Sequence, residues 1–124
     1  MDIFKSKWFN KWALKEGLSD RALIDAVRDL ENGLNDGDLG AHVYKKRAAA
    51  VGQGKRGGYR TIVAFKVADK AFFIFGFSKN QRDNIDKKEL KALKLMAKEL
   101  LGYSEHQLKI VINEGELIEV KHHE

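Results

Sequence analysis

Residues 59–79 read Tyr-Arg-Thr-Ile-Val-Ala-Phe-Lys-Val-Ala-Asp-Lys-Ala-Phe-Phe-Ile-Phe-Gly-Phe-Ser-Lys, and this stretch decides the fold. In its first nine residues the side chains alternate, so Arg60 and Lys66 point away from the face that holds the aromatic rings. Ala68-Asp69-Lys70 predicts a tight turn, and the following run from Ala71 to Lys79 is apolar on both faces, which is typical of a central strand. The stretch therefore predicts two neighbouring antiparallel strands.

Apolar residues recur at helical spacing on both sides of this stretch. Before it, they predict an amphipathic helix from Lys7 to Lys15 and a second helix capped by Ser19. After it, Asp86 and Ser104 begin capping boxes, which predict two more helices. We expect the two N-terminal helices to pack on one face of the sheet.

Two further segments are predicted to be strands. They are His42 to Arg47, where the pattern changes to a period of two, and the short run from Leu117 to Val120. The sequence therefore predicts an α+β fold in which two N-terminal helices pack on a small antiparallel sheet of at least three strands, with helices at the C-terminal end.

The composition bounds the class of protein. The chain has 124 residues, which suits a single domain with one modest core. It has no cysteine, which excludes disulfides, thiol catalysis and thiolate metal sites. No apolar run approaches the roughly 20 residues that span a bilayer, and an acid at position 2 does not fit a secretory signal. We expect a cytoplasmic protein without a membrane partner.

Residues 42–82 hold the whole positive excess of the chain. They contain ten Lys or Arg residues and a single acid, Asp69, whereas the chain as a whole has a net charge of +5. This asymmetry indicates a partner that carries phosphate groups, although a pI near 9.4 also fits an acidic partner protein.

Arg60 is the first candidate for a phosphate contact, because a guanidinium fixed on a strand presents a rigid fork to phosphate oxygens. The alternative for Arg60 is an ordinary ion pair with a surface carboxylate. Lys55 and Arg56 lie between glycines, where the backbone can closely approach a ribose-phosphate chain. The alternative for this loop is a basic hairpin connection that serves only solubility.

The sequence offers fewer candidates for proton transfer than for phosphate contacts. His42 is the only histidine near the predicted sheet, and a structural role is its alternative. A lysine within the cationic crowd, either Lys45 or Lys46, is the other candidate base. No histidine pair or carboxylate cluster has the spacing of metal ligands, so we expect a mechanism without a metal or a cofactor.

The predicted strands and the turn after them carry three motifs. These are Val43-Tyr44-Lys45-Lys46, then Gly57-Gly58-Tyr59-Arg60-Thr61-Ile62-Val63, and then Phe77-Ser78-Lys79-Asn80-Gln81-Arg82. Together they resemble the RelE/ParE superfamily of bacterial toxins, and most closely its RelE and HigB-like members. The resemblance covers about residues 20–101 of a single domain and leaves residues 102–124 as a C-terminal extension. It implies a twisted antiparallel sheet whose concave face enters the ribosomal A site and cuts mRNA.

The resemblance also implies roles for individual residues on one shared face. The catalytic residues are expected to be Arg60, which would contact the scissile phosphate, with Lys45, Lys46 and Lys79. The RNA-binding residues are expected to be Lys55, Arg56, Arg82, Tyr59 and His42. One departure concerns proton transfer, because Ile85-Asp86 stands where some RelE toxins carry a tyrosine.

Two functions follow from this resemblance. The first is the toxin of a type II toxin-antitoxin system, a metal-free mRNA endonuclease that depends on the ribosome and inhibits translation. The second is a non-catalytic toxin that binds nucleic acid or inhibits gyrase, as ParE relatives do, and an inactive copy of the fold is a third possibility. The implied partners are a cognate antitoxin, the ribosome and mRNA.

Overall fold

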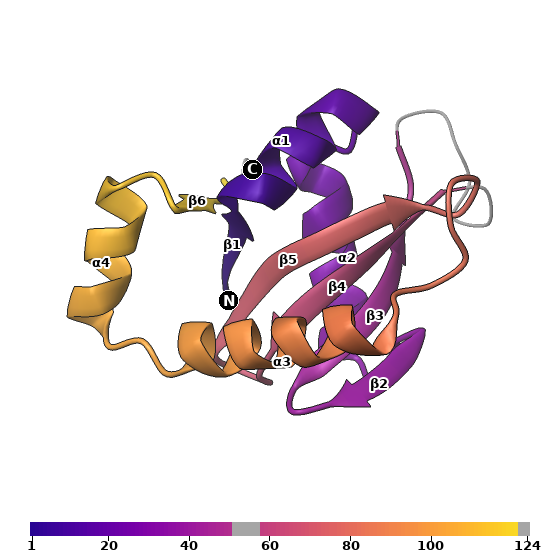
Figure 1. Ribbon diagram of the computed structural model, residues 1–124. Coiled ribbons are helices and arrows are strands. Elements are labelled where there is room, and N and C mark those ends of the chain that lie inside the picture. Colours follow the sequence, from indigo (N-terminus) through magenta and orange to yellow (C-terminus); the bar gives the residue numbers. More distant parts are fainter. Residues whose placement is uncertain (51–57, 122–124) are drawn as a thin grey trace.

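The computed structural model describes residues 1–50 and 58–121. The elements within these ranges are β1 (Asp2–Ser6), α1 (Lys7–Glu16), α2 (Asp20–Glu31), β2 (Gly37–Gly40), β3 (Val43–Ala48), β4 (Tyr59–Phe65), β5 (Lys70–Ser78), α3 (Lys87–Leu101), α4 (Glu105–Asn113) and β6 (Leu117–Glu119) (Figure 1). The α+β class is confirmed.

The strands form one mixed sheet in the order β2-β3-β4-β5-β1-β6. The pairs β3–β4 and β4–β5 are antiparallel, and β5 lies inside the sheet, as its apolar sequence predicted. The prediction of a purely antiparallel sheet was wrong, because β1 pairs with β5 in parallel. The segment of residues 2–6 is too short and too mixed in polarity to predict a strand from its sequence. The strand is recognised only by its pairing with β5.

Helices cover both faces of the sheet (Figure 1). α1 and α2 contribute Phe9, Leu23 and Val27 to one core cluster with the sheet. α3 crosses the other face and buries Leu93 and Ala97. We call these the α2 face and the α3 face.

The helix ends follow the predicted caps. Ser19 accepts a hydrogen bond from the amide of Ala22 at the start of α2. Asp86 and Ser104 each form a complete capping box at the start of α3 and α4. Each cap satisfies backbone N–H groups that would otherwise lack partners in the first turn, so the local sequence fixes where these helices begin.

Two buried lysines of the sheet hold α2 in place. Lys5 on β1 donates to Asp20 at 2.8 Å, and Lys46 on β3 lies 3.1 Å from Asp29. Both lysine side chains are less than a tenth exposed. A buried ammonium needs such a partner, since an unpaired charge there would be strongly destabilising.

The segment after Gly102 returns to the sheet. β6 pairs antiparallel with β1, and the amide of Val120 donates to the carbonyl of Ile3 at 2.9 Å. Leu108 of α4 and Leu117 of β6 join the core beneath α3. This segment therefore completes an edge of the sheet. Within the described ranges, no helix has both the length and the apolar character needed to cross a membrane.

Gly76 of β5 makes room for α1. A Cβ atom built at this position would overlap the indole ring of Trp12. The same ring packs on Phe9 and on Tyr59, with centroid separations of 5.4 and 5.5 Å. The close approach of α1 to the sheet thus depends on a glycine at position 76.

We expect Gly76→Ala to lower the free energy of unfolding by about 1–3 kcal/mol, because the added methyl group must displace the Trp12 ring from a packed core. Urea denaturation followed by circular dichroism measures the change. In a double-mutant cycle with Trp12→Ala the cost of the methyl group should largely disappear. An equal cost of Gly76→Ala with and without the Trp12 ring would contradict the steric explanation.

Candidate nucleic-acid interface

Strand alternation places Lys45, Arg47 and Arg60 on the α3 face. Arg60 of β4 lies opposite Arg47 of β3, and Lys45 lies opposite Ile62. Ile62 packs in the cluster beneath α3. Because directly opposed residues of an antiparallel pair share a face, the three cations project from the same side of the sheet.

One nitrogen of the Arg60 guanidinium is buried without an acceptor among the described residues. The residue is half-buried, and its Nη1 atom is shielded from solvent without a hydrogen-bond partner among the described residues. A buried donor left unpaired costs about 1–3 kcal/mol or more when it is charged. An acceptor brought to this nitrogen would remove that cost.

Arg82 lies beside this position on an aromatic floor. Its guanidinium carbon lies 5.5 Å from the ring centroid of Phe77, which is the cross-strand neighbour of Arg60, and 5.9 Å from that of Phe75. The Phe75 ring stacks in turn on Trp8 of α1 at 4.7 Å. The cation-π contacts fix the guanidinium above β5, on the same face as Arg60.

The carboxylate of Glu89 also holds the Arg82 side chain in place. Its Nη1 donates to Oε2 of Glu89 at 2.9 Å, and its Nη2 donates to Oε1. Its Nε donates to the carbonyl of Asn84 at 3.1 Å. The bidentate hydrogen bonds from Arg82 lower the pKa of Glu89 to about 2, with help from the amide of Asp86.

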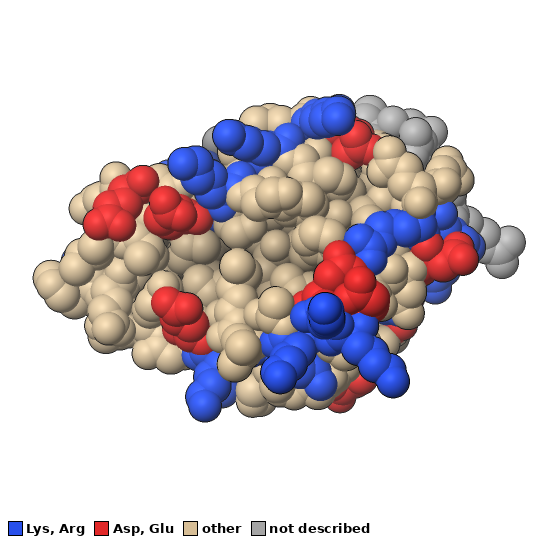
Figure 2. All heavy atoms as spheres, in the orientation of Figure 1, with Lys and Arg blue, Asp and Glu red and all other residues tan. Residues whose placement is uncertain are grey.

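Lys79 is exposed in the turn after β5, at the end of the sheet where Tyr59 pairs with Ser78. We call Lys45, Arg47, Arg60, Lys79 and Arg82 the arginine face. Figure 2 shows the α3 side of the molecule, where basic side chains gather over α3 and towards the end of β5.

Lys46 does not belong to this face, so the expectation that Lys45 and Lys46 converge was wrong. Adjacent residues on a strand point to opposite sides, and Lys46 points towards α2. Its ammonium lies between Asp29 and Asp36, at 3.1 and 3.7 Å, with a side chain that is 7% exposed. This lysine is buried between the sheet and α2, where its two ion pairs stabilise the packing of that helix.

Tyr59 and His42 also lie elsewhere. The Tyr59 ring packs on Trp12 on the α2 face, and its hydroxyl donates to the carbonyl of Glu16 at 3.3 Å. His42 stands in the turn before β3, near the opposite end of that strand from Arg47. Neither side chain is brought to Arg60.

Arg47 is the residue that the sequence analysis missed. Its Nε donates to Asp36 at 2.9 Å, and its side chain remains 42% exposed. The signal was present in the sequence, since a cation two residues after Lys45 on a strand must share its face. Lys55 and Arg56 lie outside the described residues. Within those residues, no cluster of three His, Asp or Glu side chains has the arrangement of a metal site.

The chain matches a model of a known protein family. The family model described as the RelE toxin of the RelE / RelB toxin-antitoxin system matches residues 1–120. No curated protein matches the chain significantly.

The Arg82–Glu89 pair predicts how stability depends on pH. Because the pKa of Glu89 is lowered to about 2 in the folded protein, its contribution is fully present above its ordinary value near 4.5 and is lost as the pH falls towards 2. We therefore expect Glu89→Gln, which keeps a capping-box residue at this position, to lower the melting temperature above pH 5 and to have little effect near pH 2.

Thermal unfolding across this pH range checks the prediction, with Glu31→Gln at the exposed end of α2 as the matched control. A melting-temperature difference between wild type and Glu89→Gln that stays constant from pH 6 to pH 2 would show that the ion pair does not stabilise the fold.

Proposed function

The chain belongs to the RelE toxin family and is the toxin of a toxin-antitoxin system, and we propose that it is an endoribonuclease that cleaves mRNA on the ribosome and so inhibits translation. The arginine face is the proposed RNA-binding and catalytic surface. The single observation that carries this proposal is the shielded Nη1 of Arg60, which has no partner among the described residues, with Lys45 and Arg47 on the same face of the sheet.

The proposed reaction is attack of a ribose 2′-hydroxyl on its neighbouring phosphate. A bond forms between the 2′ oxygen and phosphorus as the 2′-hydroxyl loses its proton. The bond to the 5′ oxygen of the next nucleotide breaks as that oxygen gains a proton, and a 2′,3′-cyclic phosphate remains. Negative charge builds on the non-bridging oxygens during this step. The guanidinium of Arg60, fixed on β4, stabilises that charge, with Lys45 and Arg47 as further cations.

Arg82 has a different part in this proposal. Glu89 neutralises much of its charge and occupies its paired donors. Its role is then to hold the aromatic floor and the start of α3 against the end of β5, so that the backbone around Arg60 and Phe77 stays in register. An anion that bound Arg60 and Arg82 together would have to displace Glu89 from the Arg82 guanidinium.

Proton transfer falls to lysines in this proposal. The described part of the arginine face contains neither a histidine nor a tyrosine, since His42 and Tyr59 lie elsewhere. Lys45 and Lys79 are the proposed groups for proton transfer. Lys45 lies on the arginine face, and Lys79 lies at the end of that face. A weak proton-transfer set makes correct alignment of the RNA more important, which is the contribution expected of the ribosomal A site.

The absence of a histidine or tyrosine from the described arginine face favours one second candidate, a toxin that binds nucleic acid or gyrase without cutting RNA. Primer-extension mapping of transcripts after induction separates the two functions. Discrete cuts that require translation support the endonuclease, whereas growth arrest with intact transcripts supports the second candidate.

Membership of this toxin family also implies a cognate antitoxin. We propose that the antitoxin presents acidic side chains to the arginine face, because electrostatic complementarity is the direct way to block a surface that binds phosphate. Co-purification of the chain with the product of an adjacent reading frame tests this partner.

We expect Arg60→Ala to reduce ribosome-dependent cleavage of mRNA at least about 100-fold, the usual effect of removing a donor that stabilises charge in the transition state. Arg60→Lys should retain a small part of the activity, because it keeps the charge and loses the fork. In vitro translation with mapped mRNA ends measures both variants. Cleavage by Arg60→Ala at the wild-type rate would refute the proposed site.

Lys45 and Lys46 offer a matched pair, because they are adjacent and carry the same charge on opposite faces. We expect Lys45→Gln to reduce the slope of log affinity for RNA against log salt concentration by about 0.7, as one phosphate contact is lost. Lys46→Gln should leave that slope unchanged and lower the free energy of unfolding by about 1–3 kcal/mol, since Asp29 and Asp36 lose a partner.

Salt titration of RNA binding and urea denaturation, applied to both variants, test this division of roles. Equal losses of RNA affinity in the two variants would contradict the assignment of the two lysines to opposite faces.

A further inference from the structure

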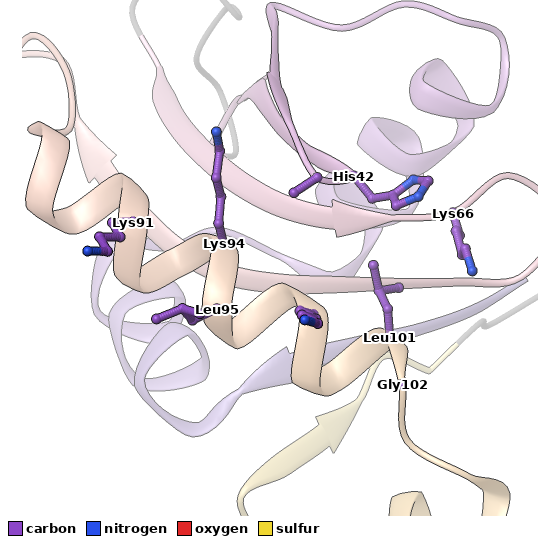
Figure 3. Close-up of a pocket in the computed structure, with 9 residues that line it drawn as sticks. His42, Lys66, Lys91, Lys94, Leu95, Leu101 and Gly102 are labelled. Atoms are coloured by element: carbon purple, nitrogen blue, oxygen red, sulfur yellow. The ribbon is translucent and has the colours of Figure 1, made fainter.

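A second basic site lies at the other end of the α3 face. A cavity of about 500 Å³ separates α3 from the end of β4 and the turn before β3. Its cationic lining consists of Lys91, Lys94 and Lys98 from α3 and Lys66 from the end of β4, with His42 beside them (Figure 3). Its lining contains no acidic residue in the part of the chain that the structure describes. We call this cavity the lysine pocket.

The lysines of this pocket have no counter-charge. Within the described ranges, none of the four forms an ion pair, although the half-buried Lys70, which follows Lys66 by four residues, pairs with both Asp69 and Glu105. Lys91, Lys94 and Lys98 recur at steps of three and four along α3, where like charges destabilise a helix by a few tenths of a kcal/mol per pair. Three lysines without carboxylate partners on one side of a helix do not stabilise the fold. Binding of an external anion explains their position better.

The pocket also has an apolar wall. Leu95 is 64% exposed on the same side of α3, and Leu101 closes the pocket near the end of that helix (Figure 3). The lysine stems add further apolar surface beneath their ammonium groups. The combination of several ammonium groups with an apolar wall suits a ligand that carries phosphates on a less polar body, such as a nucleotide chain.

The lysine pocket is separate from the arginine face. Lys66 lies just after β4 and six residues beyond Arg60, which corresponds to about 20 Å of extended chain. The two positions therefore cannot bind the same phosphate. Lys91, Lys94 and Lys98 themselves stand about 4.5 and 6 Å apart along the helix axis, which is of the same order as the spacing of successive phosphates in a nucleic acid strand.

We infer that the lysine pocket is a second RNA-binding site, which takes the sugar-phosphate backbone at a distance from the scissile bond. This inference rests on the proposed RNA target, and it extends the contact surface beyond the arginine face. Two RNA strands can supply this chemistry: the flank of the bound mRNA, or ribosomal RNA beside the A site. An acidic protein segment is the competing occupant, and the spacing of the lysines together with the apolar wall favours RNA.

The experiment compares Lys94→Gln/Lys98→Gln with the control Lys15→Gln/Lys109→Gln. Both double variants lose two positive charges at exposed or half-exposed helical positions, so net charge is matched. The affinity of each variant is measured for ribosomes without mRNA, for a short single-stranded RNA and for polyglutamate, each as a function of salt. Lys94→Gln/Lys98→Gln should bind RNA about tenfold more weakly than the control, with a salt slope smaller by about 1.5.

The separate probes identify the source of the RNA. Weaker binding to ribosomes without mRNA indicates ribosomal RNA, and weaker binding to the short RNA alone indicates the substrate strand; either result supports the inference. Equal RNA affinities of the two double variants would overturn it, as would a specific loss of polyglutamate binding without any loss for RNA.

This inference and the proposed function fail in different ways. If Arg60→Ala abolishes cleavage while Lys94→Gln/Lys98→Gln binds RNA like its control, the endonuclease proposal is supported and the second RNA-binding site is refuted. If the wild-type protein cuts no RNA while Lys94→Gln/Lys98→Gln still weakens RNA binding, the second site stands without the catalytic proposal.

Discussion

The alternation of side chains along β3 and β4 is the constraint on which the candidate site depends. It divides Lys45, Lys46 and Arg47 between two faces of one sheet. It also sets Arg47 directly opposite Arg60, an arrangement in which like charges repel. Asp36 relieves part of that repulsion by accepting from Arg47, which leaves Arg60 as the guanidinium that an incoming anion would satisfy.

The two faces of the sheet use cations in opposite ways. On the α2 face, Lys5 and Lys46 are buried and each has a carboxylate of α2 within reach, so their charges serve packing. On the α3 face, Arg60 and the lysines around α3 lie among few acids within the described residues. Arg82 combines both uses of a cation, because it lies at the edge of the basic surface and its charge is paired with Glu89. A formal charge summed over residues 42–82 hides this division.

Local signals predicted most of the fold. The caps at Ser19, Asp86 and Ser104 fixed three helix starts, because each involves residues within one turn of the chain. The strand β1 was missed because its partner β5 lies about 70 residues away and the pairing is parallel. The role of Gly76 was missed for the same kind of reason, since the Trp12 ring that needs the space comes from a distant helix.

The sequence by itself determined the α+β class, the central position of β5, the basic character of residues 42–82 and the position of Arg60 on a strand. These follow from periodicity, capping and composition, which act over a few neighbouring residues. Only the tertiary structure decided which cations are accessible. It paired Lys46 with α2, turned Tyr59 into the core, placed Arg47 beside Arg60 and moved His42 to the lysine pocket. The physical reason is that burial and charge pairing depend on which distant elements meet, and strand register and helix packing settle that only in the folded chain.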